Sequence, residues 1–92
     1  MERRTILFSG RVQGVGFRMT AVQFAEELPL TGTVRNTEDR DVELVVQGEM
    51  ADIDALVQRL HEHFGSFIRN TVQRSSPPFP TVRPGQGVRV TY

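Results

Sequence analysis

The chain has 92 residues, of which 11 are basic, 11 are acidic and none is cysteine, so its formal net charge is zero. This length suits one domain, and the lack of cysteine excludes disulfides, thiolate metal sites and a cysteine nucleophile. A neutral chain has no overall field to attract nucleic acid or an anionic membrane, and no stretch approaches the roughly 20 apolar residues of a membrane span. We therefore expect a single cytoplasmic domain, residues 1–92, that is monomeric and has neither nucleic acid nor membrane as a partner.

The first half of the chain predicts three strands and one helix. A short apolar run that ends in glycine, Arg3–Gly10, predicts a buried strand. Apolar residues then recur at helical spacing from Phe17 until Pro29, which stops the helix. Two β-rich segments follow, Thr31–Glu38 and Asp41–Gly48, and the polar residues between them predict a hairpin turn.

The second half predicts one more helix and two more strands. Ala51–Phe64 has an apolar stripe at helical spacing, and Ser66–Arg74 is typical of a strand. The proline-rich segment Ser75–Gln86 predicts an exposed loop before a final short strand, Gly87–Tyr92. The order β-α-β-β-α-β with a short fifth strand at the C-terminus predicts an α+β fold of the ferredoxin-like type. In that fold two helices cover one face of an antiparallel sheet.

A glycine-rich loop joins the first predicted strand to the first predicted helix. The stretch SGRVQGVGFRMT contains Gly10, Gly14 and Gly16, and Arg18 falls in the first turn of the helix. A helix N-terminus has unpaired backbone N–H groups, and glycines allow neighbouring N–H groups to point at one anion. The planar guanidinium of arginine matches two phosphate oxygens. The stretch therefore predicts a phosphate-binding loop.

The spacing of the glycines separates this loop from two common nucleotide-binding motifs. A P-loop needs GxxxxGK[ST], and the chain has no lysine at all. The dinucleotide fingerprint reads GxGxxG, whereas the glycines here read GxxxGxG. The aromatic residues occur at helical spacing, which indicates a core and not the stacking surface of an RNA-binding sheet.

Other polar residues are weaker candidates for a site. His61 and His63 are two positions apart on a predicted helix and so point in different directions, which argues against a metal site. Asn70 has no glycine-rich neighbour, and Ser9 has no histidine partner in any recognisable pattern. Arg11 either adds positive charge at the mouth of the loop or is simply exposed, and the sequence leaves both readings open.

The residues of the loop also resemble a known family. GRVQGVGFR, Gly10–Arg18, is similar to the signature of the acylphosphatases, and nearly every position of the nine matches. The resemblance continues through GTVRNTEDRDVE, Gly32–Glu43, and reaches a terminal strand that ends in an aromatic residue, Tyr92. It covers essentially the whole chain and implies the fold predicted above.

The resemblance implies that the protein hydrolyses small carboxyl-phosphate anhydrides and needs no metal or other cofactor. Its substrate would be a small acyl phosphate, and inorganic phosphate or sulfate would bind as the anion. The catalytic residues implied are Arg18, which binds the phosphate, and Asn36, which positions the attacking water. The phosphate-binding loop implied consists of Arg11, Val12, Gln13, Gly14, Val15, Gly16 and Phe17.

Three positions depart from the pattern of the family. Thr33 stands where an aromatic residue is common, Arg40 where the hairpin usually has glycine, and Val88 where phenylalanine is common. Because arginine is unfavourable in a two-residue hairpin turn that needs a positive φ, we expect a longer or looser hairpin here. A non-catalytic module that binds phosphate or carbamoyl phosphate is the alternative function, and a carbamoyl phosphate-recognising maturation domain or a nucleic-acid-binding domain fits less well.

Overall fold

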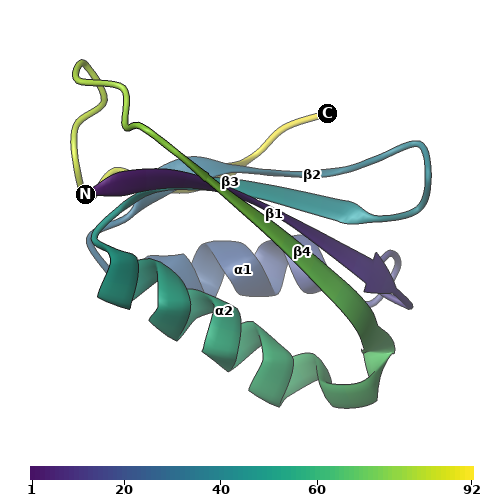
Figure 1. Cartoon of the computed structure of the whole chain (residues 1–92). Helices are drawn as coiled ribbons and strands as arrows, with labels where there is room; N and C mark the ends of the chain where they lie inside the picture. Colours follow the sequence, from purple (N-terminus) through teal and green to yellow (C-terminus); the bar gives the residue numbers. More distant parts are fainter.

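A computed structural model describes all 92 residues, and in it two helices lie on the same face of a five-stranded sheet (Figure 1). A single 3₁₀ turn, Gly65–Phe67, joins the second helix to the strand that follows it. The order of the elements along the chain is β1 (Glu2–Gly10), α1 (Phe17–Ala25), β2 (Thr31–Asn36), β3 (Val42–Gly48), α2 (Met50–Phe64), β4 (Ile68–Ser76) and β5 (Gly87–Val90).

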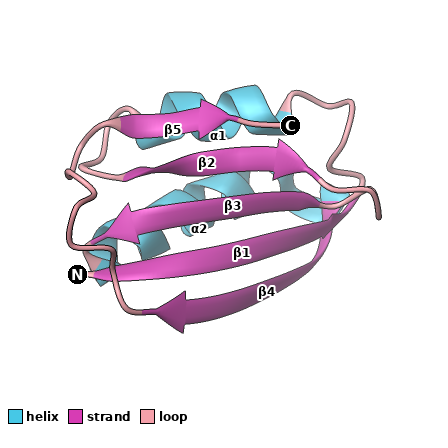
Figure 2. Cartoon of the chain, turned by 90° about the horizontal axis from the view of Figure 1, so that it is seen from above, coloured by secondary structure: helices cyan, strands magenta, loops and turns pink.

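The strands lie in the spatial order β4-β1-β3-β2-β5, with the helices behind the sheet (Figure 2). The pairs β1–β3, β1–β4 and β2–β3 are antiparallel. This arrangement confirms the predicted ferredoxin-like α+β fold, with both helices on one face and a short fifth strand at the C-terminus. Neither helix is long and apolar enough to cross a membrane.

The prediction of an antiparallel sheet is wrong for the fifth strand. β5 pairs with β2 in parallel, and the sheet is therefore mixed. The physical reason is the route of the segment 77–86, which starts at the β4 edge and ends at the opposite edge beside β2. Since β5 then runs back against the direction of β4, it has the same direction as β2. Two further backbone bonds, Gly87 N–H to Leu30 C=O (2.9 Å) and Thr91 N–H to Val34 C=O (2.9 Å), extend this pairing.

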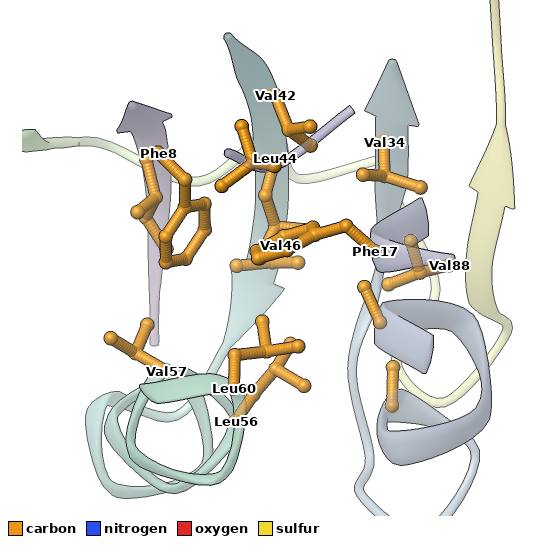
Figure 3. Packing of buried hydrophobic residues seen from close by; sticks show 14 of the residues in the cluster. Phe8, Phe17, Val34, Val42, Leu44, Val46, Leu56, Val57, Leu60 and Val88 are labelled. Atoms are coloured by element: carbon orange, nitrogen blue, oxygen red, sulfur yellow. The ribbon is translucent and has the colours of Figure 1, made fainter. Parts of the chain in front are cut away.

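The core lies between the sheet and the two helices. Alternate strand residues, such as Phe8, Leu44 and Val46, point from the sheet toward the helices, which contribute Leu56 and Leu60 from α2 (Figure 3). The cluster contains 18 buried residues. The other face of the sheet has no helix over it, so its side chains are available for other contacts.

The end of the first helix and the start of the fourth strand differ slightly from the prediction, whereas the second helix ends at Phe64 as predicted. The first helix was expected to continue to Pro29, but α1 ends at Ala25. The N–H of Leu28 bonds to the C=O of Ala25, an i→i+3 bond, so the chain tightens into turns before the proline. Similarly, the 3₁₀ turn delays the start of β4 to Ile68.

Candidate active site

The glycine-rich loop, the start of α1, the end of β2 and the C-terminal strand enclose a cavity of about 300 Å³. The loop lies at one end of the helix layer, where β1 leaves the sheet. The cavity is lined by Val12, Gly14, Gly16, Phe17, Arg18, Met19, Asn36, Val90 and Tyr92.

Two buried side chains fix the ends of the loop. Val12 is 1% exposed and Phe17 is 2% exposed, and both belong to the core. The ring of Phe17 packs 4.9 Å from that of Phe8 and stacks 4.5 Å from that of Phe64. Because Phe17 is the first residue of α1, this packing also fixes the position of Arg18.

The glycines between these anchors turn the backbone toward the cavity. Gly14 and Gly16 have φ values of 77° and 80°, the left-handed region that side chains disfavour. The first backbone bond of α1 runs from Thr20 N–H to the C=O of Gly16 (3.0 Å), and Gly16 provides no side-chain cap. The N–H groups of the first helical turn therefore have no partner inside the helix and form a positive end at the cavity.

Arg18 adds a full positive charge to this helix end. It makes no ion pair with any carboxylate of the chain, and its nearest aromatic neighbour is Tyr92, whose ring centre lies 5.9 Å from Cζ. No acidic residue lines the cavity. The combination of backbone N–H groups and an unpaired guanidinium gives the cavity the electrostatic character of an anion site.

Asn36 enters the same cavity from the opposite wall. It is the last residue of β2 and pairs with Val42, so its side chain lies on the helix-covered side of the sheet, as Val34 does. Its Oδ1 atom is buried and has no hydrogen-bond partner in the protein. A buried acceptor without a partner is uncommon, and here it lies where a small molecule could donate to it.

The side chain of Gln13 ties the loop to the strand that bears Asn36. Its Nε2 atom donates to the backbone C=O of Thr37 (3.1 Å) and to that of Asp41 (2.9 Å), the two residues at the base of the β2–β3 hairpin. The loop and the end of β2 are therefore held in one fixed arrangement. The sequence alone indicated a role for the backbone of Gln13 but not this role for its side chain.

The hairpin itself is longer than a two-residue turn, as predicted. Thr37 N–H bonds to Asp41 C=O (2.9 Å) and Arg40 N–H bonds to Thr37 C=O (3.2 Å). This is the pattern of a three-residue loop whose last residue is left-handed, and Arg40 has φ 68°. The arginine therefore adopts the backbone conformation that glycine usually supplies.

Three residues of the predicted loop do not line the cavity. Arg11 is exposed, its N–H bonds to the C=O of Phe67 (2.8 Å), and its guanidinium lies 5.3 Å from the Phe67 ring centre. Val15 packs against the core, and Gln13 points to the hairpin. The remaining wall of the cavity, formed by Met19, Val90 and Tyr92, was not predicted, because part of it depends on the parallel placement of β5 beside β2.

The other polar candidates lie away from the cavity. His61 Nε2 is 2.9 Å from Thr71 Oγ1, whereas the ring of His63 packs against Phe24, so the two histidines face different neighbours. No group of three or more metal-ligating side chains is clustered in the structure. Asn70 is exposed on β4, where it pairs with Ser9. Both side chains lie on the face of the sheet that the helices leave open.

The fold and the cavity define a class of protein: a small α+β domain with a positively charged cavity between a glycine-rich loop and a sheet strand. The acylphosphatase family model matches residues 4–76, and the chain belongs to this family. An acylphosphatase of Paenarthrobacter aurescens is 52% identical over 59 residues, which are 64% of this chain and 63% of that relative. The matched part thus spans less than two thirds of the length of that relative.

Solved structures support the same assignment over the full chain. The crystal structure of acylphosphatase from Bacillus subtilis superposes with a TM-score of 0.86 at 26% identity and covers 100% of both chains. An acylphosphatase structure from Coxiella burnetii has a TM-score of 0.81 at 34% identity and covers 98% of this chain and 92% of that one.

Proposed function

We propose that this protein hydrolyses small acyl phosphates to a carboxylate and inorganic phosphate. Membership of the acylphosphatase family supports this activity. The single observation that carries the proposal is that one cavity is lined by the glycine-rich loop, Arg18 and Asn36. The working unit proposed is one domain, residues 1–92, acting as a monomer.

In this proposal the first task of the site is to hold the phosphate. The N–H groups at the start of α1 and the guanidinium of Arg18 bind its non-bridging oxygens. Phosphoryl transfer spreads negative charge over these oxygens in the transition state, and fixed donors stabilise that charge. The unpaired state of Arg18 supports this role, because its guanidinium need not give up a carboxylate partner first.

The second task is to position one water molecule in line with the bond that breaks. The buried Oδ1 of Asn36 accepts a hydrogen bond from this water, whose oxygen then attacks phosphorus. The bond between phosphorus and the acyl oxygen breaks, and the carboxylate leaves with the electron pair. A phosphate oxygen takes the proton of the water, so the proposal needs neither a side-chain base nor a metal.

Release of phosphate from benzoyl phosphate in the presence of EDTA tests this function. We expect turnover that excess EDTA leaves unchanged. Turnover that EDTA abolishes and added Mg²⁺ restores would contradict the metal-free mechanism. Binding of inorganic phosphate without any turnover would instead identify a non-catalytic phosphate-binding module, which is the alternative function.

A further inference from the structure

A second cavity, of about 410 Å³, lies on the face of the sheet that the helices leave open. Its roof is the segment 77–86, here called the strap, which rises on the opposite side of the sheet from α1 and α2 (Figure 1). It shares no lining residue with the active-site cavity. The lining residues are Arg3, Thr31, Gly32, Thr33, Val45, Val46, Gln47, Phe79, Val82, Gln86, Gly87 and Arg89.

Two side chains of the sheet hold the strap in place. The amide of Gln47, which is 6% exposed, donates to the C=O of Phe79 (2.9 Å) and accepts from its N–H (2.9 Å). The hydroxyl of Thr31 accepts from the N–H of Gln86 (3.1 Å) and donates to the C=O of Arg83. Because both halves of the strap are tied to strands, the cavity is already formed without a ligand.

The only charged residues that line this cavity are two arginines, and neither makes an ion pair. The guanidinium of Arg3 lies over the ring of Phe79, with Cζ 4.0 Å from the ring centre. The Nε atom of Arg3 is buried and has no partner. A buried donor without a partner is costly, so an acceptor that reached it would be bound favourably. Arg89 is exposed at the other side of the cavity.

The register of the sheet sets how far apart the two arginines lie. Arg3 is opposite Gln47, in β3, and Arg89 is opposite Thr33, in β2. The strands that carry the arginines, β1 and β5, are separated by β3 and β2, and Arg89 is offset along the strands by two residues from the row of Arg3, so the two backbone positions are about 16 Å apart. The apolar side chain of Val45 lies between them on the floor, and the strap contributes Val82.

We propose that this cavity binds an elongated organic dianion, with a carboxylate at each end and an apolar or aromatic middle. One carboxylate pairs with the guanidinium of Arg3 and the other with that of Arg89. The middle of the ligand lies against Val45, Val82 and Phe79. No acidic side chain of the lining competes for either arginine.

The test is a titration of the ¹⁵N-labelled chain, followed by NMR, with 2,6-naphthalenedicarboxylate and separately with the monoanion 2-naphthoate. We expect the amide signals of Gln47, Phe79 and Arg89 to shift, and the dicarboxylate to bind about ten-fold more tightly than the monocarboxylate. This factor corresponds to one added charge-assisted hydrogen bond. Arg89→Gln should reduce the affinity for the dicarboxylate to that for 2-naphthoate.

Arg74→Gln provides the matched control, because Arg74 is exposed on the same open face, opposite Thr5, but does not line the cavity. We expect it to bind both probes as the parent does. Equal affinities of the parent for the two probes would overturn the proposal, as would an equal loss in Arg74→Gln and Arg89→Gln. Shifts confined to residues of the active-site cavity would also overturn it. The reference spectrum of each variant shows directly that it is folded.

Discussion

Two arginines, Arg4 and Arg18, show how differently this small chain uses the same side chain. The side chain of Arg4 is 8% exposed, and its guanidinium donates to Glu2 (3.0 Å), Asp54 (2.6 Å) and Gln73 (3.0 Å). The hydrogen bond from Arg4 lowers the pKa of Glu2, and a hydrogen bond from Ser75 has a smaller effect in the same direction. Arg18, in contrast, has no carboxylate partner and lines a cavity.

This contrast separates the polar groups that stabilise the fold from those that are free to bind a ligand. The charge of Arg4 is neutralised inside the protein. Its hydrogen bonds to Asp54 and Gln73 link β1 to α2 and β4. Around Arg18, the helix N-terminus and the buried Oδ1 of Asn36 also lack partners. Buried polar groups are normally paired, so a cluster of unpaired ones in one cavity indicates a binding site.

The largest effect is expected from Arg18→Gln, which keeps a donor but loses the charge and the planar fork. We expect kcat/KM for benzoyl phosphate to fall by about 10²–10³-fold, since loss of one oxyanion donor has effects of this size. Phosphate affinity, measured by calorimetry, should fall as well. Arg4→Gln should instead lower the free energy of unfolding by about 1–3 kcal/mol and leave kcat unchanged. Normal phosphate affinity in Arg18→Gln would show that Arg18 is not the phosphate ligand.

Asn36→Ala should separate catalysis from binding. Its proposed partner is the attacking water, so we expect kcat to fall by about 10²-fold while the affinity for inorganic phosphate changes little. Asn70→Ala is the control, because Asn70 is exposed on the open face of the sheet. Turnover of Asn36→Ala at the parent rate would refute the proposed water-positioning role.

Gln13→Ala removes the tether between the loop and the hairpin. We expect kcat to fall about ten-fold, because a small displacement of Asn36 relative to Arg18 misaligns the water and the phosphate. Gln23→Ala, at an exposed position of α1, should have no effect. If both variants keep the parent kcat, the two hydrogen bonds of Gln13 do not position the site.

Arg40→Gly should make the protein more stable. A left-handed backbone costs about 1–2 kcal/mol for a residue with a side chain, and glycine removes this strain. Part of the gain is offset because glycine raises the conformational entropy of the unfolded chain. We expect a net gain of about 0.5–1 kcal/mol in urea denaturation. Asp39→Gly, one position earlier, should not stabilise. A loss of stability in Arg40→Gly would indicate that the arginine side chain makes a favourable contribution of its own.

The smallest effect concerns the pH dependence of stability around Arg4. Because the folded-state pKa of Glu2 is lowered, its ionised form stabilises the fold above the ordinary value of 4.5. This contribution is lost as the pH falls through the lowered folded-state value. The melting temperature of Glu2→Gln should therefore decrease less steeply below about pH 4.5 than that of the parent. Identical slopes would show that the bond to Arg4 adds no stability.

Local sequence patterns were sufficient to predict most of the fold and much of the candidate site. Helical periodicity, strand alternation and the glycine spacing are properties of short segments, and they predicted the order of the elements and the loop that precedes Arg18. The assignment of Asn36 to the same site came from the resemblance to the acylphosphatases and not from these local patterns. The roles of both residues stay predictions that the variants above test.

Contacts between distant segments account for what the sequence did not reveal. The parallel pairing of β5 depends on the path of the strap, which Gln47 and Thr31 hold from 32 and 52 residues away. The tether from Gln13 spans 24 and 28 residues. Such bonds have no local periodicity, and a glutamine that makes them has the same sequence signature as an exposed one.

The phosphate-binding role of the glycine-rich loop is best tested by titrating the ¹⁵N-labelled protein with inorganic phosphate and following each residue by NMR. We expect the backbone amides of Gly14, Gly16, Phe17 and Arg18 to shift together with one dissociation constant, and Arg18→Gln to raise this constant. If phosphate shifted amides elsewhere and left the loop unchanged while the protein still hydrolysed benzoyl phosphate, the loop would not be the phosphate site.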